Sequence, residues 1–269
     1  MNFKTTIYRF GMSLLQRYWR LTGSRKIKAF GQFLRITPGS TFPAYRHLRL
    51  PKESYPSKIV RYTDFVQIHA VIRYVEGLIG TPTIINVGAH HGVYAMILGK
   101  IVQQREGKFI ALEPTPEAFT VLLENVKLNN LENTVICEQV AALDKSGFAD
   151  VKLNGSQSHI LFKQGGGQVK VTTLQKLMDK YDIENVDLLI IDVEGAELPV
   201  LQGFPWESKR PGRIFCELHP YAWKDFGYAG EDLRLFLEKH RYRCFDMYLH
   251  EYTLFGKEHY IGPCFFVPN

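Results

Sequence analysis

Short apolar runs alternate with helix-like stretches through residues 83–220, and this alternation constrains the fold more than any other feature of the chain. The apolar runs are TIINV (83–87), KFIALE (108–113), TVICEQVAA (134–142), DLLIIDV (187–193) and RIFCELH (213–219). Their branched and aromatic residues favour strands. Helical patterns run from about Tyr94 to Gln104 and from Pro116 to Leu128. Repeated strand–helix alternation predicts an α/β fold with a doubly wound, mostly parallel sheet and helices on both faces.

The charge of the chain is unevenly distributed. Its 269 residues carry a net charge of +6, with 45% hydrophobic and 22% charged residues, as expected of a globular protein. Residues 1–80 hold 14 Lys and Arg but only 3 Asp and Glu, a balance of +11, so the remainder is net acidic at −5. We therefore expect a basic N-terminal appendage, helical and extended, over residues 1–62, and one domain over residues 63–269.

The N-terminal segment has a helical pattern over residues 5–21, where an apolar stripe is flanked by arginines. Such a helix could lie on a membrane, although packing on the main domain or on a second subunit is favoured. Residues 36–58 are rich in Pro, Ser, Gly and Thr and predict an extended connector. Without a signal-peptide pattern or a long apolar run, and with four dispersed cysteines predicted to be free thiols, we expect a cytoplasmic protein, peripheral to the membrane at most.

The loop after the first run, NVGAHHGVYA, contains Gly88 and Gly92, which let the backbone turn tightly and approach a ligand. Its spacing does not match the dinucleotide fingerprint or the phosphate loop of nucleotide-binding folds. The second run ends in Glu113, 25 positions after Gly88, where a carboxylate can accept hydrogen bonds from ribose hydroxyls. The pair predicts an adenosine-bearing ligand without a bound pyrophosphate.

Four blocks of the chain, in this order, resemble the FkbM-type methyltransferases: IINVGAHHGVYA, ALEPTPEAFTVLLENVKLNN, VTTLQKLMDKYDIENVDLLIIDVEGAELPVLQG and IFCELHP. The resemblance covers roughly residues 81–220, and DVEGAE is its most specific part. It implies the seven-strand, Rossmann-like class I methyltransferase fold. It also implies S-adenosylmethionine as cofactor and O-methyl transfer, which many members carry out on sugars or sugar-bearing natural products.

The resemblance also assigns roles to positions. It implies a cofactor loop at Gly88, Ala89 and Gly92, a ribose contact at Glu113, and a place for Asp192 at the methionine or reaction end. The full set of cofactor-binding residues that we expect is Asn86, Gly88, Ala89, His90, Gly92, Glu113, Ala141, Ala142 and Asp192, with Ala141 and Ala142 near the adenine. Asn86 and His90 depart from the usual DVGAN pattern, and Asn86 offers no charge to the ammonium of the cofactor.

Methyl transfer to a hydroxyl requires alignment of the acceptor and removal of its proton by a general base or with the help of a metal. Asp192, Glu217 and His219 stand at the ends of two apolar runs and are the predicted catalytic residues. His219 could act as the base or be a structural histidine. Alternatively, Asp192, Glu217 and a further oxygen ligand could bind Mg²⁺. Glu194 and Glu197 are predicted to cap the following helix or to bind the substrate.

The acceptor is expected to be a sugar, a glycan or a glycosylated natural product. The polar segment 147–172, read as a flexible crossing loop or a small hairpin, and residues 220–230 would contact it, with His159, Tyr221, Trp223 and Tyr228 as candidates. Two alternatives remain. The basic N-terminus suggests nucleic-acid methylation, which the net acidic main domain disfavours. Asn86 favours a non-catalytic glycan-binding or scaffold protein on the same fold.

Overall fold

The computed structural model describes residues 23–38, 40, 64–154, 157–161, 169–246, 249–251 and 262–269. For residues 64–65, 150–154 and 157–161 only the backbone is described. The helix predicted over residues 5–21 and most of the connector predicted over 36–58 lie outside it. Among the helices that are described, none combines the length and apolar character needed to cross a membrane.

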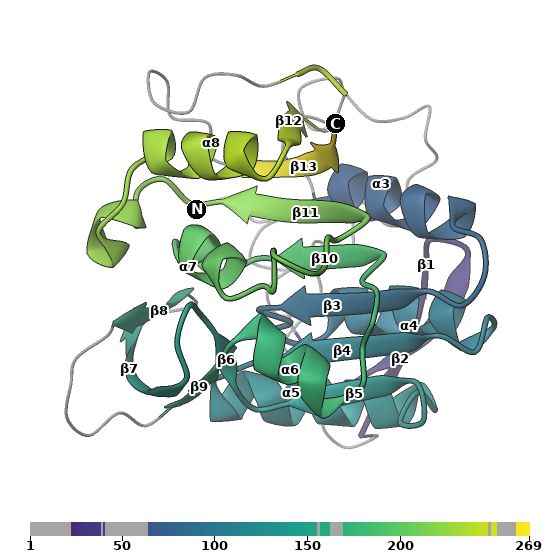
Figure 1. The fold of residues 1–269 in the computed structure, drawn as a ribbon. Coiled ribbons are helices and arrows are strands. Elements are labelled where there is room, and N and C mark those ends of the chain that lie inside the picture. Colours follow the sequence, from purple (N-terminus) through teal and green to yellow (C-terminus); the bar gives the residue numbers. More distant parts are fainter. Residues whose placement is uncertain are drawn as a thin grey trace, which may run out of the picture.

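The main sheet contains seven strands within the described residues, in the spatial order β12-β13-β11-β10-β3-β4-β5 (Figure 1). They are β3 (Thr83–Val87), β4 (Lys108–Leu112), β5 (Val135–Glu138), β10 (Leu188–Ile191), β11 (Arg213–Leu218), β12 (Tyr242–Asp246) and β13 (Gly262–Pro268). The pairs from β11 to β5 are parallel, and β13 is antiparallel to both of its neighbours. The doubly wound, mostly parallel sheet predicted from the sequence is confirmed.

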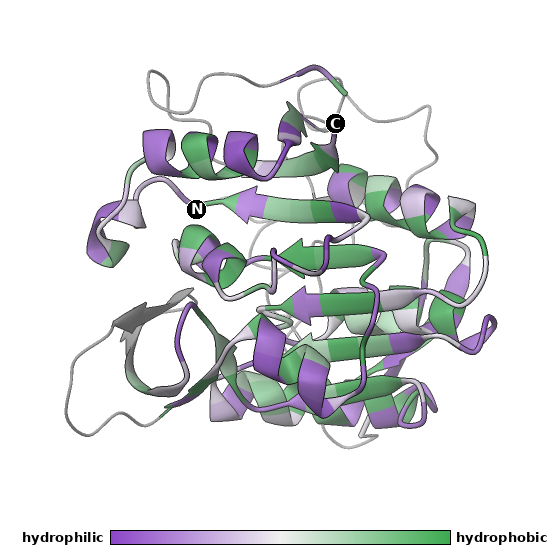
Figure 2. Cartoon of the chain, viewed as in Figure 1, coloured by the Kyte–Doolittle hydropathy of each residue, from purple (hydrophilic) through white to green (hydrophobic). Residues whose placement is uncertain are grey.

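Helices cover both faces of this sheet (Figure 1). One face packs on α3 (Asp64–Gly77), α4 (Val93–Gln103) and α5 (Pro116–Leu128). The other packs on α6 (Leu174–Lys180), α7 (Glu197–Gln202) and α8 (Gly230–Lys239). Figure 2 shows the central strands as largely apolar, and β10 is fully buried along its length. Burial on both faces explains why these strands are continuous apolar runs rather than alternating patterns.

A second, smaller sheet lies beside the carboxyl ends of the parallel strands (Figure 1). Its order is β6-β9-β7-β8, formed by β6 (Ala141–Ala142), β7 (Gly147–Asn154), β8 (Gln157–Leu161) and β9 (Val169–Thr172). The antiparallel β7–β8 pair confirms the hairpin reading of the segment 147–172. The single strand predicted over 134–142 is wrong, because the chain leaves the main sheet after Glu138 and β6 pairs with β9 instead.

A hairpin that was not predicted is formed by β1 (Arg25–Ala29) and β2 (Gln32–Ile36). Its inward side chains belong to the same apolar cluster as α3, α4 and α5. Asn125 of α5 ties it to the sheet edge, because its Oδ1 accepts from the Thr37 amide at 2.9 Å and its Nδ2 donates to the His91 carbonyl at 2.7 Å. The end of β2 is thereby linked to the loop after β3. The domain boundary near residue 62 stays a prediction.

Candidate active site

Several of the predicted site residues follow four strands that are neighbours in the main sheet. Glu113 follows β4, the loop of residues 88–92 follows β3, Asp192 follows β10, and His219 follows β11. From β3 the chain continues to β4 and β5 on one side and later returns to β10 and β11 on the other. Such a reversal of strand order opens a crevice at the carboxyl ends of the strands, where ligands of doubly wound folds bind. The structure therefore brings these residues to one edge.

Glu113 holds the loop after β3 in place. Its carboxylate is 5% exposed, with Oε2 accepting from the His90 amide at 2.8 Å and Oε1 accepting from the Thr115 amide at 2.9 Å and its hydroxyl at 2.6 Å. The Gly88 and Ala89 amides donate to the Leu112 carbonyl at 3.0 and 2.8 Å. A carboxylate offers about four acceptor positions, so Glu113 keeps room for a further donor. This anchoring role was not predicted.

Asn86 and Gly88 stand where β3 leaves the sheet. Asn86 is 1% exposed, lies opposite Ile190 and Ala111 in the register, and neither polar atom of its side chain has a hydrogen-bond partner in the described part of the chain. Gly88 has a φ of +79°, and a Cβ there would lie 1.8 Å from the Asp192 carbonyl oxygen. Gly88 therefore lets the ends of β3 and β10 approach closely. Next to them, the buried side-chain amide of Asn86 has no hydrogen-bond partner among the described residues.

The other predicted cofactor residues differ in exposure. Ala89 is buried and His90 is exposed with a φ of +47°, its ring stacked on His91 at 3.8 Å. Gly92, at a φ of +83°, precedes the first turn of α4. Ala141 and Ala142 are each 3% exposed and pack into two different apolar clusters, Ala142 into the main core. Their predicted contact with adenine stays a prediction.

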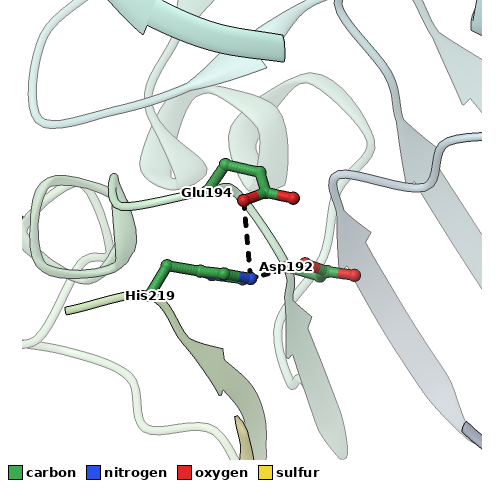
Figure 3. A group of neighbouring side chains, drawn as sticks. All are labelled: Asp192, Glu194 and His219. Atoms are coloured by element: carbon green, nitrogen blue, oxygen red, sulfur yellow. Dashed lines mark ion pairs between the residues drawn. The ribbon is translucent and has the colours of Figure 1, made fainter. Parts of the chain in front are cut away.

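Asp192, Glu194 and His219 converge at the exits of β10 and β11 (Figure 3). His219 Nε2 lies 3.8 Å from Asp192 Oδ1 and 3.7 Å from Glu194 Oε2. The three side chains differ in exposure, at 6% for His219, 39% for Asp192 and 24% for Glu194. A buried imidazole thus forms the floor of a cluster whose carboxylates face solvent. The sequence predicted the Asp192–His219 pair, and the structure adds Glu194 to it.

Glu197 is the buried support of this cluster. Its side chain is fully buried, and Oε1 lies 2.8 Å from His219 Nδ1 and accepts from the Gly195 amide at 3.0 Å. Oε2 accepts from Trp223 Nε1 at 2.8 Å and lies 2.9 Å from the Tyr228 hydroxyl. A carboxylate accepts hydrogen bonds, so Glu197 holds the imidazole with Nδ1 as the donor. The only sequence signal was an acidic residue among apolar neighbours in AELPVL.

This environment changes the acidity of two of the three predicted catalytic groups. Burial works to lower the pKa of His219, but the Glu197 hydrogen bond and the nearby Asp192 and Glu194 carboxylates outweigh it and raise that pKa to about 9. The imidazole is therefore protonated near neutral pH when no other cation is present. Enclosure at the strand end, and then the Glu217 carboxylate, raise the pKa of Asp192 above its usual range.

The remaining residues that were predicted to act in catalysis or to contact the acceptor lie in different environments. Glu217 lies within β11 opposite Pro263 and acts on Asp192 through its charge, and it is not one of the three residues whose ligand atoms come together. Trp223 and Tyr228 are 6% and 8% exposed and pack on Glu197, so of the three aromatic candidates only Tyr221, at 49%, faces solvent. The Tyr221 hydroxyl donates to Glu194. His159 lies in β8, opposite Lys152.

Comparisons with known proteins find methyltransferases. The family model of the Methyltransferase FkbM domain matches residues 86–244. Methyltransferase sdnD of Sordaria araneosa is 29% identical over 174 residues, covering 51% of this chain and 66% of that protein. Hexuronic acid methyltransferase AglP of Haloferax volcanii is 25% identical over 137 residues, covering 50% and 54%. The chain thus spans under two thirds of the length of each relative.

Among solved structures, a methyltransferase FkbM from Methylobacillus flagellatus KT shares 15% identity and a TM-score of 0.44, over 72% of this chain and 47% of that one. An O-methyltransferase from Bacillus cereus, solved in complex with SAH, shares 13% identity and a TM-score of 0.43, over 82% and 86%.

Proposed function

The chain belongs to the FkbM methyltransferase family, and we propose that it transfers the methyl group of S-adenosylmethionine to a hydroxyl of a sugar, a glycan or a glycosylated natural product. The observation that carries this proposal is the row of strand ends β4, β3, β10 and β11. Along this row, Glu113 and the loop that it anchors precede a cluster of two carboxylates and an imidazole, which supports the proposal.

Two features of the strand ends fit an S-adenosyl ligand. Asn86 is a buried amide without a partner among the described residues, and a ligand carrying amino and carboxylate groups can supply both a donor and an acceptor. Gly88 lets the loop after β3 lie close against the backbone of Asp192, which keeps these two strand ends together. Glu113 would accept from the ribose hydroxyls with its remaining lone pairs. When bound, the cofactor supplies an electrophilic methyl group on a sulfonium.

The residues of the chain must then orient the acceptor and take its proton. Asp192 is partly exposed, and its partial enclosure and the neighbouring carboxylates raise its pKa, so it is a stronger base than an ordinary carboxylate. His219 is held rigidly by Glu197 and keeps its Nε2 directed at Asp192 and Glu194. We assign proton acceptance to Asp192 and orientation of the acceptor to His219 and Glu194, with Tyr221 as the exposed aromatic wall against which a sugar ring can stack.

The cofactor assignment is tested by calorimetry with S-adenosylhomocysteine. The variant Glu113→Gln removes the charge, and Glu117→Gln, in the exposed first turn of α5, is its matched control. Hydrogen bonds to a charged group contribute about 1.5–3 kcal/mol, so Glu113→Gln should weaken binding by about 10- to 100-fold while Glu117→Gln leaves it unchanged. Equal affinities in the two variants, or no binding to the folded wild type, would refute the assignment.

The acceptor is tested with a panel of sugars that includes hexuronic acids, the class named for the relative from Haloferax volcanii. A hexuronic acid offers both hydroxyl and carboxyl oxygens, so product chemistry separates two outcomes. A methyl ether formed on a hydroxyl survives mild alkali, whereas a methyl ester does not. Alkali-stable methylation that is lost in Asp192→Asn supports the proposal. Alkali-labile methylation would move the reaction to a carboxyl group.

A further inference from the structure

Asp192, Glu194 and His219 each offer one ligand atom, and these three atoms lie within 4.8 Å of one another. The separations of 3.7 and 3.8 Å from His219 Nε2 to the two carboxylate oxygens are too long for hydrogen bonds. Two ligands about 2.1 Å from one ion lie roughly 3.0 Å apart at right angles and at most about 4.2 Å apart. Both separations from His219 Nε2 therefore fall within the reach of one shared cation.

The charge balance of the cluster points the same way. Asp192, Glu194 and Glu197 have His219 as their single cationic ion-pair partner among the residues that the structure describes. Three carboxyl groups thus share one imidazole. Buried or partly buried charges are usually neutralised by partners or by metal ions, and no Lys or Arg ion pair in the described region fills this role here.

The imidazole is oriented as a metal-ligating histidine would be. Its Nδ1 is engaged by the fully buried Glu197 carboxylate at 2.8 Å, so Nε2 is directed at the two outer carboxylates from a side chain that is 6% exposed. Trp223 and Gly195 in turn donate to Glu197 and fix its position. Histidine ligands of metal ions commonly pair their second nitrogen with a carboxylate in this manner.

We propose that Asp192, Glu194 and His219 bind one divalent cation, through Nε2 of the histidine and one oxygen of each carboxylate. A mixed set of one imidazole and two carboxylates suits a first-row ion such as Mn²⁺, which accepts both ligand types. The 39% exposure of Asp192 and 24% exposure of Glu194 leave one side of the cluster open for water or an acceptor oxygen. This ligand set differs from Asp192 with Glu217, because Glu217 remains within the ladder of β11.

The bound cation would lower the pKa of an acceptor hydroxyl and assist its deprotonation. Only this catalytic step depends on the methyl transfer proposed above. Cation binding itself requires neither cofactor nor acceptor. The test is therefore made without them, so that failure of the proposed methyl transfer and failure of the metal site give different results.

The experiment uses the full chain after treatment with EDTA and desalting. Mn²⁺ is added, and loss of the free-ion signal in electron paramagnetic resonance gives affinity and stoichiometry, while electron spin echo modulation detects ¹⁴N coupled to the bound ion. The variants are Asp192→Asn and Glu194→Gln. Glu231→Gln, at an exposed position in the first turn of α8, is the matched control. Circular dichroism checks that each variant is folded.

We expect one Mn²⁺ per chain with coupling to one imidazole nitrogen, and at least about tenfold weaker binding in both site variants, the lower end of the range for ligand-supporting residues. The Glu231→Gln control should bind as the wild type does. Absence of stoichiometric Mn²⁺ binding, absence of the ¹⁴N coupling, or wild-type affinity in Asp192→Asn and Glu194→Gln would each overturn the proposal. Because the coupling is measured on the wild type, the histidine assignment does not depend on a folded His219 variant.

Discussion

Gly88 offers a sharp test of how the strand ends are packed. Its φ of +79° disfavours any side chain, and a Cβ there would also lie 1.8 Å from the Asp192 carbonyl oxygen. Gly80 provides the matched control, because its φ is +82° and nothing lies within 4 Å of the position of its Cβ. Alanine at either site meets the same backbone strain, but only alanine at Gly88 meets a neighbouring backbone.

The expected magnitudes follow from these two differences. A left-handed backbone costs an L-residue about 1–2 kcal/mol, and this is the whole loss of unfolding free energy expected for Gly80→Ala. Overpacking a tight site adds about 1–3 kcal/mol, so Gly88→Ala should lose about 2–5 kcal/mol in total. The effect of alanine on the entropy of the unfolded chain is common to both variants and cancels in the comparison.

Urea denaturation monitored by circular dichroism measures both losses, with the slope of the transition checked for equality between variants. The quantity of interest is the difference between the two variants, about 1–3 kcal/mol. Equal destabilisation of Gly80→Ala and Gly88→Ala would show that the backbone at the exit of β10 can move away at no cost in free energy. The close approach of Asp192 to the loop after β3 would then not be a constraint on the fold.

Two further results are expected from the electrostatics. Glu197→Gln leaves the buried His219 without its carboxylate partner and turns an amide N–H₂ toward buried donors. The free energy of unfolding should therefore fall by about 3–5 kcal/mol, and wild-type stability in urea would contradict this supporting role of Glu197. Burial, and then the neighbouring His90, lower the pKa of His91 to about 4, so the unfolded chain binds the proton more readily and stability should fall as the pH drops from about 6.5 toward 4. His91→Gln should flatten that part of the pH profile, and an unchanged slope in this variant would contradict the reasoning.

The strands and helices of the domain were largely readable from local patterns. The helix predicted over Pro116–Leu128 has those bounds in the structure, and the runs at 83–87 and 188–191 are strands buried on both faces. These elements are predictable because the apolar period and the helix-start proline act within a few residues. The order of strand and helix then allowed few topologies other than a doubly wound sheet.

The pairing of distant segments was decided only by tertiary packing. The run over 134–142 looked like one strand, but its last two residues pair with β9 in another sheet. The β1–β2 hairpin was not predicted, although its strands alternate apolar and polar residues as half-buried strands do. Its inner face is buried by α4 and α5. A strand of this kind is stabilised by its neighbours rather than by its own sequence.

The candidate site divides in the same way. Asp192 and His219 could be placed at strand ends from the sequence, because a parallel sheet presents its ligand edge there. The separate roles of Glu194 and Glu197 could not be assigned from the sequence, because the direction of each side chain depends on the backbone conformation between them. The positive φ of Glu194 and the burial of Glu197 send one side chain to the open cluster and the other beneath His219. Local residue chemistry therefore identified the edge of the sheet, while long-range packing decided which acid faces solvent and which one holds the histidine.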